Sequence, residues 1–132
     1  MLPARKAMLG EALQEMERPV AVWIEGGEEA LAVPDLGDLV ALQPLLGVRL
    51  SPAAAEPWLP PRRYPVYRLG PPESLRDARA GFVGFPQGFM LDAFCDLAVA
   101  LSRGDAPASP LARDTLRQLE SPVDLKILTS PG

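Results

Sequence analysis

A single thiol and no imidazole limit the chemistry open to this chain. Its 132 residues include one cysteine, Cys95, and no histidine. A thiol–disulfide cycle passes through a mixed disulfide that a second thiol must release. Zinc and other transition metals are bound mainly by cysteine and histidine side chains. We therefore expect neither a self-sufficient disulfide oxidoreductase nor a transition-metal site in this chain.

Cys95 lies within an apolar, helix-forming stretch. Its acidic neighbours Asp92 and Asp96 would raise the pKa of the thiol, because nearby negative charge disfavours the thiolate. Small, partly buried thiols are common in such stretches. We predict a structural role for Cys95, with a regulatory or mixed-disulfide role as the alternative.

Two other segments resemble binding loops in composition. One is rich in carboxylates, which lie at Glu25, Glu28, Glu29, Asp35 and Asp38. Their spacing matches no calcium-binding loop, so we predict a solvated surface and no metal site. The stretch 84–88 is rich in glycine, but it lacks the lysine and the following Ser or Thr of a phosphate-binding loop. No cofactor is expected.

The overall composition is that of a globular protein, with 48% apolar and 23% charged residues. Acidic residues outnumber Lys and Arg by 17 to 13, and the basic residues are scattered, which disfavours a nucleic-acid partner. No apolar run reaches the roughly 18 to 20 residues needed to span a bilayer. The N-terminus is amphipathic rather than signal-like. These features favour a cytoplasmic protein with no membrane contact.

The periodicity of apolar residues predicts an α/β fold. Prolines and glycines separate most of the elements, and the two strands either side of residues 70–72 should pair as an antiparallel hairpin. The connection 51–63 is rich in proline. The predicted helices are 4–16, 35–46, 87–102 and 111–119, and the predicted strands are 20–24, 48–50, 66–69, 80–83 and 123–128.

The last two predicted elements repeat the first two. Setting Pro122 over Pro19 aligns a helix, a Glu-x-Pro-Val sequence and an alternating strand. The aligned pairs are Leu13 with Leu116, Met16 with Leu119, Val20 with Val123, Val22 with Leu125 and Ile24 with Ile127. Self-similarity of this kind indicates repeated structural units, although chance can produce so short a match. The chain would then hold one unit and the opening of a second.

Three motifs carry a resemblance to a known family: Tyr64-Pro65-Val66-Tyr67, Gly81-Phe82-Val83-Gly84-Phe85-Pro86-Gln87-Gly88 and Ser121-Pro122-Val123-Asp124-Leu125-Lys126-Ile127-Leu128. With the element order, they resemble the N-terminal unit of tandem thioredoxin-fold proteins. Examples are the N-terminal domain of the alkyl hydroperoxide reductase flavoprotein subunit and the glutaredoxin-like protein disulfide oxidoreductases. The resemblance covers most of the chain from Met8, but it is poor over residues 25–63.

The resemblance implies a thioredoxin-like domain over residues 1–105, with a central mixed sheet flanked by helices. Residues 106–132 would be a linker and the first helix and strand of a truncated second unit. Pro65, after Tyr64, would be a cis proline that opens the third strand and lies in a groove against the redox site. An ordinary trans proline is the alternative.

Active members of the family carry Cys-x-x-Cys directly after the first strand, where a helix N-terminus lowers the pKa of the thiol. This chain has Gly26, Gly27, Glu28 and Glu29 at that place, so the redox loop is degenerate. In the flavoprotein the first unit also lacks these cysteines and the second unit carries the redox chemistry. A second unit here would place its Cys-x-x-Cys just after Gly132. A natural short protein and a fragment of a longer one both fit this sequence.

The resulting expectation is a non-catalytic domain for docking, scaffolding or dimerisation in thiol-redox or peroxide-reduction metabolism. The alternative is half of a glutaredoxin-like protein disulfide oxidoreductase whose redox cysteines lie outside this chain. A third reading is a small-ligand binder that uses the groove beside Pro65. Candidate interface residues are Trp58, Val123, Leu125 and Ile127. The expected partner is a second copy of the chain or a redox protein, because an apolar strand with an open edge seeks pairing.

Overall fold

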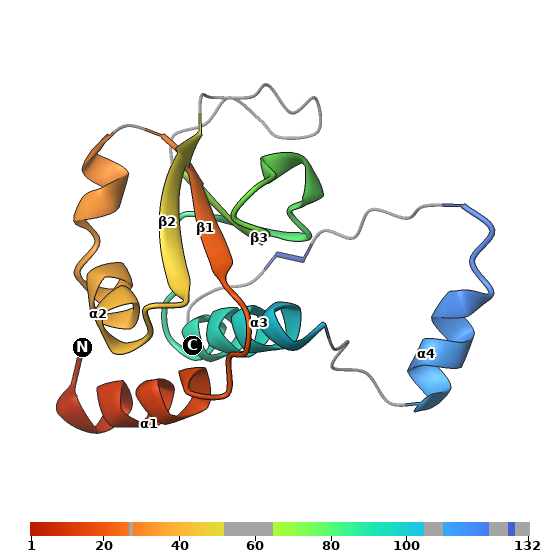
Figure 1. The fold of residues 1–132 in the computed structure, drawn as a ribbon, viewed down its shortest axis with the longest axis horizontal. Coiled ribbons are helices and arrows are strands. Elements are labelled where there is room, and N and C mark those ends of the chain that lie inside the picture. The colour runs from red at the N-terminus through yellow and green to blue at the C-terminus, as the bar shows by residue number, and fades with distance from the viewer. Residues whose placement is uncertain (27, 52–64, 105–109, 122–126, 129–132) are drawn as a thin grey trace.

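The computed structural model describes five segments of the chain, residues 1–26, 28–51, 65–104, 110–121 and 127–128. Helices and strands alternate along most of it (Figure 1). The helices are α1 (Pro3–Leu13), α2 (Pro34–Leu42), α3 (Phe89–Arg103) and α4 (Pro110–Arg117), with 3-10 turns η1 (Glu28–Ala32) and η2 (Leu75–Asp77). The strands are β1 (Val20–Glu25), β2 (Leu46–Ser51), β3 (Val66–Gly70) and β4 (Ala80–Val83).

The four strands form one mixed sheet in the order β2-β1-β3-β4. β1 runs parallel to β2, and β3 runs antiparallel to both β1 and β4. The parallel pair is joined by α2, as a parallel connection requires a crossover. The structure thus confirms an α/β fold with a mixed sheet, and it confirms the predicted antiparallel pairing of β3 with β4.

Prolines and glycines set several helix ends. Pro3 and Pro34 each open a helix at a first-turn position, where the missing N–H costs no hydrogen bond. Gly104 ends α3 in the left-handed conformation, with φ of 74°. The predicted helix 35–46 is too long. Residue 43 takes extended angles before Pro44, because proline disfavours the helical conformation of the residue that precedes it.

The core lies between one face of the sheet and three helices. α1 packs against α2 and α3, and α3 also contacts β1 and β3. Alternate residues of β1, namely Val20, Val22 and Ile24, belong to this core, as period-two alternation requires. Met8 is one of the apolar residues of the predicted helix 4–16, but its side chain is 67% exposed.

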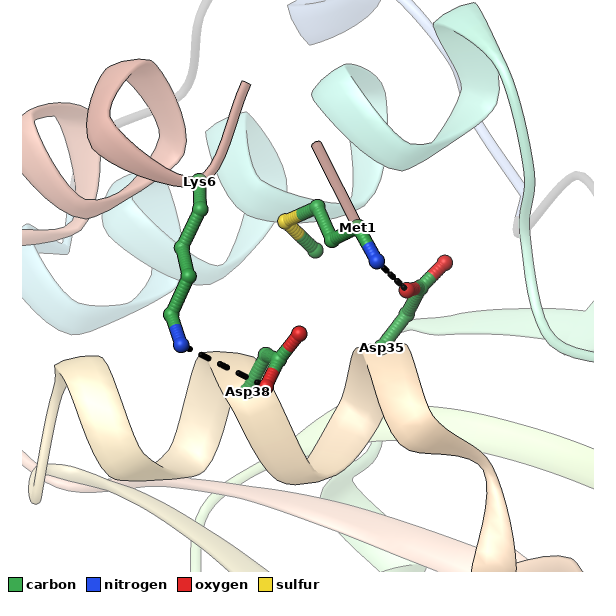
Figure 2. Close-up of polar contacts among 4 residues, drawn as sticks. All are labelled: Met1, Lys6, Asp35 and Asp38. Carbon is green, nitrogen blue, oxygen red and sulfur yellow. Dashed lines mark hydrogen bonds and ion pairs between the residues drawn. The ribbon is translucent and has the colours of Figure 1, made fainter. Parts of the chain in front are cut away.

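Ion pairs join α2 to the N-terminal part of the chain. Figure 2 shows the ammonium group of Met1 beside Asp35 and the Lys6 side chain reaching toward Asp38. Each nitrogen–oxygen distance is 3.5 Å. Asp35 also lies in the first turn of α2, where a carboxylate is favoured by the helix dipole. These contacts place two members of the carboxylate-rich segment against cations.

A buried serine fixes the turn between α1 and β1. The Ser102 hydroxyl, on the last turn of α3, accepts hydrogen bonds from the backbone N–H groups of Glu17 and Arg18 at 2.6 and 2.8 Å. The same hydroxyl donates to the Arg18 carbonyl at 2.8 Å. Two backbone donors that would otherwise be buried without a partner are thereby satisfied.

α4 stands apart from the sheet and from the other helices, at the right of Figure 1. Two apolar side chains of α4, Leu111 and Leu116, and that of Leu119 just after it are largely exposed. The predicted helix 111–119 is thus present at nearly its expected place. Of the predicted strand 123–128, only residues 127 and 128 are described, and they lie in no regular element. Across the described segments, no helix is long and apolar enough to cross a membrane.

Candidate functional site

The candidate site is the carboxyl end of β1, where the chain turns from the sheet into η1. Gly26 lies at this turn directly against Pro65. A Cβ atom on Gly26 would lie 2.8 Å from the Pro65 Cβ and 3.6 Å from the Ala30 Cβ. Since real Cβ atoms do not approach so closely, only glycine fits here without a shift of the proline. The structure therefore brings together two of the predicted site residues, Gly26 and Pro65.

A third segment, just after β4, contributes Gly84 to this site. We call Gly26, Ala30, Pro65, Tyr67 and Gly84 together the turn cluster. The Gly84 N–H donates to the Pro65 carbonyl at 2.8 Å. Gly84 has φ of 76°, a conformation that other residues rarely adopt. The Tyr67 hydroxyl donates to the Ala30 carbonyl at 3.1 Å, and burial raises the pKa of Tyr67. These bonds hold β3 and the end of η1 in fixed positions around Gly26.

A buried ion pair lies beside the turn, on the face of the sheet opposite the helices. The Glu25 carboxylate is 3.3 Å from the Arg68 Nε. Glu25 is only 2% exposed, so the prediction that it belongs to a solvated acidic surface is wrong. The strand register explains the burial, because Glu25 lies between Ser51 of β2 and Val66 of β3. Sequence reasoning did not identify Arg68.

Trp23 occupies the same face of the sheet as Glu25. Its side chain is partly exposed, and its indole N–H donates to the Pro71 carbonyl at 3.1 Å. In the register it is flanked by Arg49 of β2 and Arg68 of β3. Trp23 lies outside the core cluster, because the core takes the alternate residues of β1.

The lone thiol belongs to the core and not to the turn cluster. Cys95, on α3, is 1% exposed and packs among the buried apolar side chains. Burial, together with the charges of Asp92 and Asp96, raises the pKa of Cys95 to about 12, and only Arg5 opposes the rise. The predicted direction of the shift is correct, although burial is its larger cause. The thiol stays protonated at neutral pH and is shielded from solvent.

Several predicted site residues cannot be placed. Gly27, Trp58, Tyr64, Val123 and Leu125 lie outside the described residues, so the isomer of the Tyr64–Pro65 bond remains a prediction. The backbone of residues 28 and 29 forms the start of η1. Ile127 is described and 72% exposed.

No group of three or more metal-ligating side chains occurs within the part of the chain that the structure describes. An open groove of about 580 Å³ lies elsewhere, between α1 and α2. Its lining residues are Pro3, Lys6, Ala7, Gly10, Glu11, Gln14 and Leu42. None of these belongs to the turn cluster, so the groove gives no support to ligand binding beside Pro65.

No protein-family model matches this sequence. No curated protein matches it either.

Proposed function

We propose that this chain is a non-catalytic, thioredoxin-like docking domain that works in thiol-redox or peroxide-reduction metabolism. One observation carries the proposal. At the end of the first strand, where the resemblance calls for a redox cysteine, a glycine packs against Pro65. The only cysteine of the chain is buried in α3 with a pKa of about 12. A thiol in that state is a poor nucleophile.

The arrangement of the sheet supports the thioredoxin-like part of the proposal. The mixed order β2-β1-β3-β4 is compatible with that fold. Pro65 directly precedes β3 and contacts the turn after β1, which is the relation that the resemblance implies for its proline. The family's fold thus accounts for why these two distant segments of sequence meet.

A docking role fits the surface beside this turn. Leu31, next to Ala30 in η1, is 41% exposed and presents an apolar side chain beside the turn cluster. The turn itself is fixed by the Tyr67 and Gly84 hydrogen bonds, and the Glu25–Arg68 pair lies buried beside it. A preorganised, partly apolar surface can bind a partner without paying for its own ordering. Binding here needs no nucleophile.

Reduction of insulin disulfides, with dithiothreitol as the electron source, tests the absence of catalysis. We expect the chain and its Cys95→Ala variant to give the same rate as dithiothreitol alone, because the buried, protonated thiol cannot attack. A rate above that background, lost in Cys95→Ala, would overturn the non-catalytic assignment. It would make Cys95 a working thiol and favour the oxidoreductase reading.

A gain-of-function experiment tests whether the turn occupies the place of a redox loop. The double substitution Gly27→Cys with Ala30→Cys restores Cys-x-x-Cys directly after β1. We expect it to reduce insulin at least tenfold faster than the matched pair Leu116→Cys with Leu119→Cys, which has the same spacing on and after exposed α4. Equal rates from two folded variants would contradict the thioredoxin-like assignment, since position would then confer nothing.

A further inference from the structure

β4 is an edge strand of the sheet that the described residues form. Among the described residues it pairs only with β3. Its sequence, Ala-Gly-Phe-Val over residues 80–83, carries no charge. Natural proteins protect sheet edges with charged residues, prolines or covering elements. The opposite edge has such protection, because β2 carries the exposed Arg49 and packs against α2.

The hydrogen-bond pattern identifies a donor on this edge. In an antiparallel pair, successive residues point their N–H groups alternately toward and away from the neighbouring strand. The Gly84 N–H points toward β3, because it donates to the Pro65 carbonyl. The N–H of Val83 therefore points away from β3, toward the open side. Val83 itself is 58% exposed.

The chain also carries a segment suited to pair with that edge. Residues 123–128 alternate apolar and charged side chains before ending in two apolar ones, which is the pattern of a half-buried strand. The two described residues of the run, Ile127 and Leu128, are 72% and 100% exposed. α4, which precedes the run, exposes its leucines and lies apart from the other elements (Figure 1). The described end of this run and the apolar side chains of α4 are thus exposed to solvent.

We propose that the open edge of β4 binds residues 123–128 of a second copy of this chain, and that the exchange is reciprocal. Five residues separate Gly104 from Pro110, so α4 and the strand can be directed away from their own body. Exchange between two copies uses each edge and each strand once, so it closes as a twofold dimer. It covers both uncharged edges and brings α4 against the partner's body.

This inference goes beyond the proposed function, because it concerns the edge of β4 and not the docking surface beside Gly26. The two can fail separately. Disulfide reduction by the chain would overturn the non-catalytic role and leave the dimer intact. A monomeric chain that reduces no disulfide would overturn the exchange and leave the docking surface beside Gly26 in place.

The first test is the solution mass of the full 132-residue chain, measured by size-exclusion chromatography with light scattering. We expect twice the chain mass of 14.2 kDa. Val83→Pro removes the outward N–H and keeps the Gly84–Pro65 bond, and edge strands tolerate proline. We expect this variant to be monomeric with an unchanged circular dichroism spectrum. Val83→Thr keeps the N–H and should remain dimeric.

A complementation experiment separates exchange from other modes of pairing. Leu125→Pro disables the donated strand, and Val83→Pro disables the accepting edge, so each variant alone should be monomeric. An equimolar mixture should regain a heterodimer, held by one intact strand on one intact edge. A monomeric wild-type chain overturns the proposal, because the strand then pairs within its own copy or not at all. A dimeric Val83→Pro variant, or a mixture that stays monomeric, overturns it as well.

Discussion

α1 and α4 are the two helices that the sequence repeat aligns, but the aligned apolar residues are buried in α1 and exposed in α4. Leu13 of α1 is fully buried, while its repeat partner Leu116 of α4 is 58% exposed. Met16 and Leu119, just after each helix, differ in the same way. The aligned residues are of similar type, but their neighbours differ, because α1 packs on α2 and α3 whereas α4 stands apart from the other elements.

An amphipathic pattern predicts that a helix has an apolar face, but it does not predict which surface covers that face. A helix of eight residues such as α4 is not stable alone in water, because nucleation is unfavourable and few hydrogen bonds follow it. Burial of the apolar face must supply the stability. α1 obtains it from its own domain. α4 has to obtain it from a further surface, which is the reason for the exchange proposed above.

The largest expected contrast comes from the matched substitutions Leu13→Ala and Leu116→Ala. The first leaves a cavity in a packed core and should reduce the free energy of unfolding by about 3–5 kcal/mol. The second removes an exposed side chain and should change it by less than about 0.5 kcal/mol. Urea denaturation of dilute chain, below the concentration that favours dimers, measures both. Equal losses would mean that α4 is as deeply packed as α1.

A smaller contrast is expected from two hydroxyl groups. Ser102→Ala removes the acceptor of the Glu17 and Arg18 amides and should reduce stability by about 1–3 kcal/mol, the penalty for leaving buried donors unpaired. Thr115→Ala in α4 removes only an exposed bond to the Leu111 carbonyl. Thermal unfolding should show a clearly lower Tm for Ser102→Ala alone. A Tm unchanged by Ser102→Ala would contradict the role given to this hydroxyl.

The smallest expected effect is the contribution of Cys95 to the pH dependence of the free energy of unfolding. The folded chain keeps the Cys95 proton up to about pH 12, whereas the unfolded chain loses it from near the ordinary value of 9.0. The unfolded state then binds fewer protons, so the free energy of unfolding should fall as pH rises above 9. Cys95→Ala should flatten the pH dependence of the free energy of unfolding between pH 9 and about 10, where the tyrosines of the unfolded chain are still mostly protonated.

Reactivity toward a thiol reagent at pH 8 checks the same contrast without denaturation. Cys95 should react only when the chain unfolds, while a thiol placed in α4 by Leu116→Cys should react at once. Rapid modification of Cys95 in the native chain would show that this part of the core opens readily, and the pH argument would then lose its basis.

Much of the fold could be predicted because its signals are local. Prolines at the helix starts and the glycine after α3 act through their own backbone angles, and the apolar runs predicted β1, β3 and β4 to within one residue. The predictions were wrong where the outcome depends on contacts with other elements. β2 begins at Leu46, earlier than predicted, because it pairs with Val20 at the start of β1. Met8 has helical spacing but faces solvent.

The candidate site was less predictable. Gly26 and Pro65 could be named from the resemblance, but their contact depends on β3 lying beside β1. In the sequence Glu25 is one of several acidic residues in an acidic segment, and no residue near it indicates that it pairs with Arg68. The signal that could have indicated their burial is that Glu25 and Arg68 lie in β1 and β3, the two inner strands of the sheet. The local pattern of residues predicts neither the strand order nor the register.

The sequence by itself determined the order of helices and strands, the absence of a second thiol and the amphipathic character of α4, since these follow from residue type and short-range spacing. The tertiary structure alone decided which apolar faces are covered. It also decided that Glu25 pairs with Arg68 and that Gly26 packs against Pro65. Each of these depends on contacts between residues about 40 positions apart, which form only when the strands are placed side by side in the sheet.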